Sequence, residues 1–179
     1  MLMKNNKNIF LYFILVFFFL IKSLAAEEFD ITALNIKLFQ DSEKIQAEGN
    51  VLIVGQDGIT IEAENAIYDK KENIIDAKKS VKITDTKTNN VLISDKIQYL
   101  KNKEEIVAEG NVFFKDAKTN NELTSDMIQY SKNKEEIVAE GNVFLKDAKT
   151  NDELTSDKIR YSKNLEKILA EGNVFFKGS

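Results

Sequence analysis

Apolar and polar residues alternate along most of the chain after residue 28. In the segment 106–115, Ile106, Val112 and Phe114 share one side of an extended chain, and Glu109 lies on the other. Alternation with a period of two is typical of a β-strand that buries one face. Similar segments follow one another with turns rich in Asp, Asn and Gly between them. The pattern predicts about ten strands from Phe29 onward, antiparallel because the connections are short.

The pattern repeats every 31 residues. The phrase A-E-G-N-V occurs four times, a degraded copy occupies residues 77–81, and a tyrosine keeps the same interval. The phrases begin at Ala47, Ala108, Ala139 and Ala170, and the tyrosines are Tyr68, Tyr99, Tyr130 and Tyr161. A fixed period of this length indicates stacked copies of a two-strand unit that cannot bury its apolar face alone.

The apolar face changes sides within the second strand of each unit. Leu123 and Ser125 share one face of the strand, whereas Ile128 and Tyr130 share the other. A one-residue shift of this kind requires a bulge or a bend, and the glycine of A-E-G-N-V marks a matching bend in the first strand. We therefore expect strands that turn a corner, giving two facing sheets in a flattened roll or an open V.

Two polar positions at this corner need their own explanation. Asp126, with its equivalents Asp95 and Asp157, is expected to accept hydrogen bonds at the corner rather than to bind calcium, because the oxygen-rich spacing of known loops is absent. Lys79 replaces the glycine in the degraded copy and would face inward by parity. Either a bulge redirects this lysine or that copy leaves the apolar interior.

The amino-terminal segment has the layout of a secretory signal peptide. Lys4 and Lys7 precede an apolar run, and small residues follow it near Ala25. The alternative is an uncleaved membrane anchor. We expect residues 1–25 to be a signal peptide and residues 26–179 to form one exported domain, complete or as the amino-terminal part of a longer protein.

Composition excludes several classes of function. Removal of residues 1–25 takes away three lysines and no acid, so the net charge changes from −4 to −7. Such an acidic chain is a poor binder of nucleic acid. The chain has no cysteine and no histidine, which removes the usual metal ligands and nucleophile–base pairs. We therefore predict no enzymatic activity, no catalytic residues, no metal and no cofactor.

The repeated phrases resemble a known family. A strand with A-E-G-N-V, a polar turn and an L-x-S-D-x-I-x-Y strand are similar to the OstA-like domain of lipopolysaccharide transport. That domain occurs in the periplasmic bridge protein LptA and at the amino terminus of the outer-membrane assembly protein LptD. The resemblance covers roughly Phe29 to Lys177. It implies an all-β, V-shaped antiparallel β-jellyroll in the periplasm, whose apolar groove shields lipid A acyl chains and whose ends pair edge to edge with other OstA-like domains.

Alternation and resemblance together define candidate sites. The candidate edge-pairing residues are Val174, Phe175 and Phe176. The candidate residues of the lipid-binding groove lie on the apolar parity of their strands: Ile45, Val51, Ile53, Val81, Ile83, Ile97, Tyr99, Ile106, Val112, Phe114, Ile128, Tyr130, Ile137, Val143, Leu145, Ile159, Tyr161, Ile168, Val174 and Phe176.

Three functional hypotheses remain open at this point. The favoured one is a periplasmic module that carries lipopolysaccharide and serves outer-membrane assembly. The second is an exported β-solenoid without lipid cargo, acting as a spacer or adhesin, because apolar alternation is first of all a folding signal. The third is the amino-terminal domain of a larger outer-membrane assembly protein.

Overall fold

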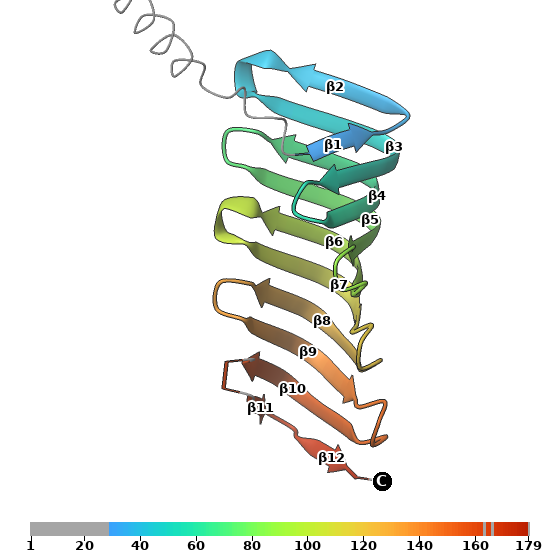
Figure 1. Ribbon diagram of the computed structural model, residues 1–179, viewed down its shortest axis with the longest axis vertical. Coiled ribbons are helices and arrows are strands. Elements are labelled where there is room, and N and C mark those ends of the chain that lie inside the picture. Colours follow the sequence, from blue (N-terminus) through green and yellow to red (C-terminus); the bar gives the residue numbers. More distant parts are fainter. Residues whose placement is uncertain (1–28, 163, 166, 179) are drawn as a thin grey trace, which may run out of the picture.

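The described residues form a single antiparallel sheet whose strands are bent near their middle. The computed structural model describes residues 29–162, 164–165 and 167–178. These residues form one twelve-stranded sheet, in which β3 to β10 follow one another in sequence order. The strands stack along the long axis of the molecule, as Figure 1 shows. The expected all-β, antiparallel fold built from two-strand repeats is thus confirmed.

Eight long strands make up the body of the sheet. They are β3 (Lys44–Gly55), β4 (Ile59–Asp69), β5 (Ile74–Asp85), β6 (Val91–Leu100), β7 (Glu105–Lys115), β8 (Glu122–Ser131), β9 (Glu136–Lys146) and β10 (Glu153–Ser162). Each unit of the sequence repeat supplies two of them. One-turn 3₁₀ helices, η1 (Gln40–Ser42) and η2 (Lys101–Lys103), lie in two of the connections.

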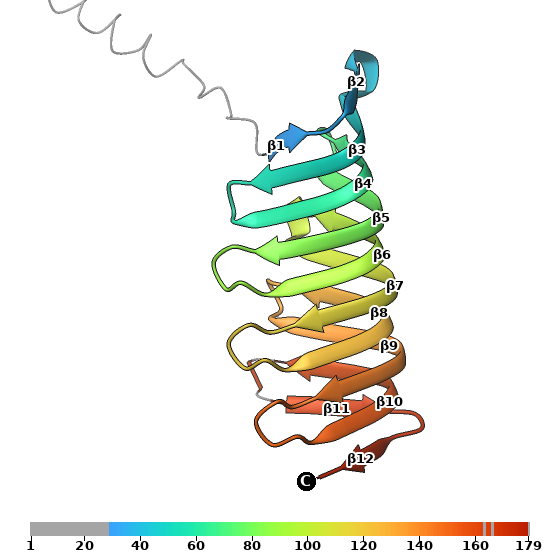
Figure 2. The ribbon, with the colours of Figure 1, turned by 90° about the vertical axis from the view of Figure 1, so that its right-hand side faces the viewer.

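Each edge of the sheet is made of two short strands rather than one long strand. At the amino-terminal edge, β1 (Phe29–Thr32) and β2 (Asn35–Phe39) pair with the two halves of β3. At the carboxyl-terminal edge, β11 (Lys167–Glu171) and β12 (Phe175–Lys177) pair in the same way with β10. Figure 2 shows how the bent strands divide the sheet into two arms that face each other.

The bends have the register of β-bulges. Between β7 and β8, Glu109 pairs with Met127 and Val112 pairs with Ser125. Two residues of one strand therefore oppose a single residue of the other, which is the definition of a bulge and increases the local bend. The same shift recurs in the pairs from β3 to β10. The corner expected from the sequence exists, but it bends one continuous sheet instead of joining two separate ones.

Two further findings concern the predicted signal peptide and membrane-spanning helices. The predicted signal peptide lies outside the described residues. Within the described ranges, the structure contains no helix with the length and apolar character needed to cross a membrane.

Candidate functional site

The space between the two arms is the candidate site. We call arm A the strand halves that carry the four repeated tyrosines, and arm B the halves that end in the turns before β4, β6, β8 and β10. The residues that face this space follow the parity predicted from the sequence. Apart from four serines, the buried side chains of the described residues are apolar. The site is therefore an apolar interior that runs along the stack of strands.

Local chemistry at the bulges explains the repeated polar residues. The Asn111 side chain donates a hydrogen bond to Asp95 at 2.7 Å, and the Asn142 side chain donates one to Asp126 at 2.9 Å. The Ser125 hydroxyl donates to the carbonyl of Met127 at 2.9 Å, across the bulge. These bonds satisfy groups that the interrupted ladder leaves unpaired. The expectation that the corner aspartates accept hydrogen bonds is confirmed.

Backbone conformation explains why the phrase contains Gly-Asn. Gly110 has a φ of +77° and Asn111 a φ of +47°, a left-handed region that favours glycine and, next, asparagine. A Cβ atom on Gly110 would lie 2.5 Å from the Asp95 carboxylate. Lys79 adopts the same conformation, with a φ of +66°, and its side chain is exposed. The bulge thus directs this lysine away from the interior.

The predicted groove residues fall into three groups by exposure. The buried ones are Val51, Ile53, Val81, Ile83, Ile97, Tyr99, Ile106, Val112, Ile128, Val143 and Ile159. The half-buried ones are Ile45, Phe114, Tyr130, Ile137, Leu145 and Tyr161. The exposed ones are Ile168, Val174 and Phe176. Most of the exposed and half-buried members belong to β7 and later segments, so the interior opens toward the carboxyl-terminal end.

Equivalent positions become more exposed toward the carboxyl-terminal end, where Phe176 also lies on an edge strand. Ile83, Phe114, Leu145 and Phe176 occupy the same place in successive units, on arm B. Ile83 is 4% exposed and Phe176 is 62% exposed, with the other two half-buried between them. Arm A follows the same trend, from a buried Tyr68 to a half-buried Tyr161.

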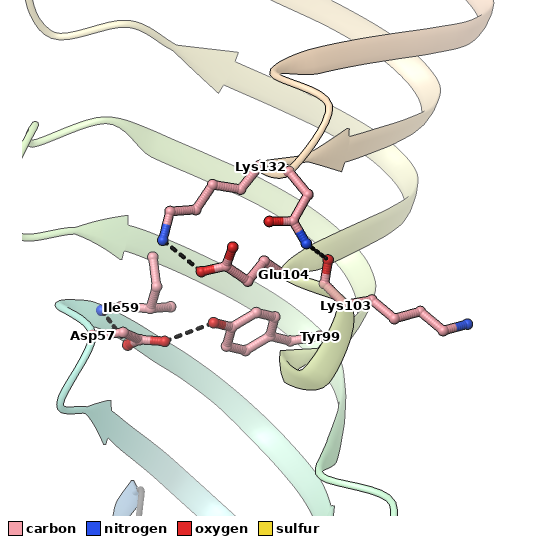
Figure 3. A network of polar contacts seen from close by, with 7 residues as sticks. Asp57, Ile59, Tyr99, Lys103, Glu104 and Lys132 are labelled. Carbon is pink, nitrogen blue, oxygen red and sulfur yellow. Dashed lines mark hydrogen bonds and ion pairs between the residues drawn. The ribbon is translucent and has the colours of Figure 1, made fainter.

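A polar network lies where the rims of the two arms approach each other (Figure 3). The Tyr99 hydroxyl of arm A donates a hydrogen bond of 2.6 Å to Asp57, which lies in the turn between β3 and β4 on arm B. Lys132 donates to Glu104 at 2.7 Å on arm A. This hydrogen bond, with the negative charge of Glu104, raises the pKa of Lys132. Burial is the main cause that raises the pKa of Tyr130.

Both ends of the sheet expose apolar side chains beside strand edges that have no partner within the described part of the chain. At the amino-terminal end these are Leu34, Ile36, Leu38 and Phe39, and at the carboxyl-terminal end they are Leu165, Ile168, Leu169, Val174, Phe175 and Phe176. Of the predicted edge residues, Phe175 and Phe176 lie in β12 and pair with β10, whereas Val174 precedes the strand. The unpaired side of such a strand can accept a further strand.

Several residues of the site were not singled out from the sequence. Phe29, on β1, is 3% exposed and packs between the arms. Asp57 lies in one of several Asp-containing turns, and nothing in the sequence distinguishes this turn from the others. The sequence placed Ser125 on the same face as Leu123 but did not name it, or its equivalents Ser94 and Ser156, as part of the site, although each precedes a corner aspartate.

Comparisons with known proteins give one family match. A family model described as OstA-like protein matches residues 30–157. Among solved structures, one match is LptH of Pseudomonas aeruginosa, described as the LptA-homologous periplasmic component of a lipopolysaccharide transport device. It is 10% identical, the match covers 83% of this chain and 93% of that one, and the TM-score is 0.35, too low to carry an argument. No curated protein matches the sequence.

Proposed function

Because the chain belongs to the OstA-like protein family, we propose that its interior shields the acyl chains of lipopolysaccharide during passage across the periplasm. The observation that carries the proposal is the uncharged inner face, which is repeated from strand to strand along the sheet. Transfer of a methylene group out of water contributes about 0.8 kcal/mol. A row of similar apolar positions holds a fatty chain without fixing it at one place, which suits a cargo that has to slide.

The opening of the interior supports a point of entry for the acyl chains. Phe114, Tyr130, Ile137 and Leu145 are half-buried and pack against the core. An acyl chain that lay along these side chains would cover apolar surface that water now reaches. We propose that lipid binds from β7 toward the carboxyl-terminal end, and that no catalysis is involved.

The two edges of the sheet support end-to-end assembly with other OstA-like domains. Leu38 and Phe39 are exposed at one edge, and Phe175 and Phe176 at the other. Strand pairing across such edges would extend the apolar interior from one domain into the next. Replacement of Phe175 and Phe176 by glutamate should weaken any concentration-dependent assembly, which sedimentation velocity measures. Assembly that is unchanged by these charges would exclude this edge as the docking site.

The test of cargo binding uses two neighbouring residues that face opposite sides of β9. A diazirine-bearing aliphatic amino acid is placed at Leu145, which faces the interior, or at Phe144, which faces outward, and purified lipopolysaccharide is added before irradiation. We expect lipopolysaccharide adducts at position 145 and few at position 144. Equal adduct yields at the two positions, or none at 145, would contradict the proposal.

A second variant tests the polarity of the interior. Val143 is 1% exposed, so Val143→Asp should reduce the capture of lipopolysaccharide at position 145. An unpaired buried charge also destabilises the fold, and circular dichroism must therefore show that the variant is folded. Val143→Thr, of nearly the same volume, is the uncharged control.

One observation favours the alternative of a structural spacer. The interior between β3 and β6 is closed, since Ile53, Ile61, Ile75 and Ile97 are each 1% exposed. A closed core needs no ligand. If lipopolysaccharide is not captured at position 145 and surface labelling finds the chain outside the cell, the spacer hypothesis replaces the transport hypothesis.

A further inference from the structure

The two ends of the interior differ although both are edges of the same sheet. Phe29 lies on the amino-terminal edge strand of arm B, paired with Gly55, and Phe176 lies on the carboxyl-terminal edge strand of the same arm, paired with Leu154. Phe29 is 3% exposed and Phe176 is 62% exposed. An edge position alone would leave both rings open to water. Something specific therefore covers Phe29.

The cover consists of aromatic rings from arm A. The ring of Phe29 meets the ring of Tyr68 edge to face, with centroids 5.1 Å apart, and the ring of Tyr99 with centroids 6.3 Å apart. The ammonium group of Lys101 lies 4.4 Å from the centre of the Phe29 ring. Edge-to-face aromatic pairs and a cation over a ring are both attractive. A side chain of arm B is thus enclosed by side chains of arm A.

A hydrogen bond holds the two arms together at the same place. Asp57 accepts the Tyr99 hydroxyl at 2.6 Å and, through its other oxygen, the Ile59 amide at 3.1 Å, as Figure 3 shows. The carboxylate is therefore fixed by its own turn and bonds across to arm A. Gly55 has no Cβ, and a Cβ there would lie 3.1 Å from the Phe29 ring and would collide with the Asp57 carboxylate. Glycine at position 55 therefore provides the space that the Phe29 ring and the Asp57 carboxylate occupy.

The strand that carries Phe29 is short and has few backbone partners. β1 has four residues and, among the residues that the structure describes, pairs with β3 alone, at the edge of the sheet. Short edge strands are among the segments of a fold that open at the lowest cost in free energy. The next segment, β2, pairs separately with the other half of β3, and Leu34 between them donates a backbone hydrogen bond to Gly49. β2 therefore keeps a pairing with β3 that does not depend on β1.

We propose that Phe29 is a plug on β1, held by the Asp57–Tyr99 hydrogen bond, which closes the amino-terminal end of the interior to acyl chains. This inference rests on the proposed function, since it concerns the same lipid cargo. Lipid reaches β7 and later strands while the plug is in place. It passes the amino-terminal end only when β1 separates from β3 and removes the ring from between the arms.

The test locks β1 onto β3. Thr32 and Leu52 are directly opposite each other in the register of these strands, and both side chains are exposed. The natural chain has no cysteine, so Thr32→Cys with Leu52→Cys introduces the only thiols. Opposed residues of antiparallel strands lie within the range of Cα separations that a disulfide spans. Oxidation fixes the plug and a reducing agent releases it.

Lipid contact is measured at two equivalent positions on either side of the proposed boundary. The diazirine amino acid is placed at Ile83 or at Leu145, and purified lipopolysaccharide is the probe. We expect adducts at position 145 to be the same in the oxidised and reduced proteins. Adducts at position 83 should be at least several-fold fewer in the oxidised protein. The single variant Thr32→Cys, treated in the same way, is the control for the reducing agent.

Two further variants open the plug without a disulfide. Phe29→Ala removes the ring, whereas Tyr99→Phe removes the hydroxyl, and with it the hydrogen bond to Asp57, while the aromatic contact stays. Both should increase the yield of adducts at position 83 relative to the yield at position 145 in the same variant. Tyr99→Phe keeps the proposal testable if Phe29→Ala does not fold.

The possible outcomes separate a failure of the plug proposal from a failure of the proposed function. Equal adducts at position 83 in the oxidised and reduced proteins, with adducts at 145, would overturn the plug and leave the proposed function standing. Unchanged adducts at 83 in a folded Tyr99→Phe variant would overturn the role of the hydrogen bond as the latch. A lack of adducts at 145 in every state would overturn the proposed function, and the plug with it.

Discussion

The bulge between β6 and β7 allows the energetic role of the Gly-Asn pair to be measured. Substitution Gly110→Ala places a side chain at a φ of +77°, which costs about 1 kcal/mol in the left-handed region. The new Cβ would lie 2.5 Å from the Asp95 carboxylate. That carboxylate would have to move and lose its hydrogen bond from Asn111, worth about 1 kcal/mol at an exposed site. We expect a total loss of about 2 kcal/mol in the free energy of unfolding.

The contribution of the carboxylate can be separated by a double-mutant cycle. Asp95→Ala alone removes the hydrogen bond and should cost about 1 kcal/mol. The double variant should lose about 2 kcal/mol instead of the sum of about 3, because without a carboxylate only the backbone cost of Gly110→Ala remains. Urea denaturation followed by circular dichroism gives these values. Additive losses would show that Asp95 does not contact position 110 and would refute the explanation of the glycine.

Lys79 provides a matched control for the backbone cost. It occupies the equivalent place in β5 with a φ of +66°, and its side chain is exposed. Lys79→Gly should therefore stabilise the protein by up to about 1 kcal/mol, because the left-handed conformation costs a glycine nothing. A loss of stability in this variant would contradict the cost assigned to a side chain in the left-handed conformation.

Three further predictions address the core, the rim and the turns. Val112→Ala removes two buried methyl groups and should lower the free energy of unfolding by about 2 kcal/mol. Phe113→Ala, at an outward-facing position, should lower it clearly less. Equal losses in urea denaturation would contradict the assignment of the two faces. Tyr99→Phe should lower the free energy of unfolding by about 1–2 kcal/mol through loss of the hydrogen bond to Asp57, and an unchanged urea midpoint would show that this bond contributes nothing to stability. Backbone amides of Thr150 and Lys149 that bond to Asp147 hold its pKa below the usual 3.8, so this carboxylate stabilises the fold above pH 3.8 and loses that effect as the pH falls through its lower folded pKa. Asp147→Asn should therefore reduce the dependence of the urea midpoint on pH in this acidic range, and an identical dependence in both proteins would contradict it.

The alternating pattern predicted the fold because a period of two specifies both the strand and its buried face. The side-chain parity of Val51, Val112 and Val143 placed each of them in the core. The change of parity between Ser125 and Ile128 likewise located the bend, since only a bulge returns the apolar residues to the inside. The sequence also led to the correct hydrogen-bonding role of Asp126.

Other features depended on contacts between distant segments, which no local pattern contains. Asp57 bonds to Tyr99 because the turn after β3 reaches the opposite arm. Phe29 appeared only as the start of the first strand, although its ring contacts two tyrosines of arm A. The alternation is nearly the same in every unit of the repeat. It could not indicate that the interior is closed near β3 and opens toward β10, since exposure depends on how far the arms stand apart.

The register that recurs from strand to strand has a consequence for how such a chain can change its length. Residues 104–134 and 135–165 differ at only five positions, and each unit begins and ends at the same point of the bent sheet. Unequal recombination between the corresponding gene segments would therefore add or remove whole pairs of strands and preserve the cross-section. Each event would change the span of the molecule by about 10 Å, twice the spacing of neighbouring strands. Natural variants of this protein are accordingly expected to differ in reach by discrete increments.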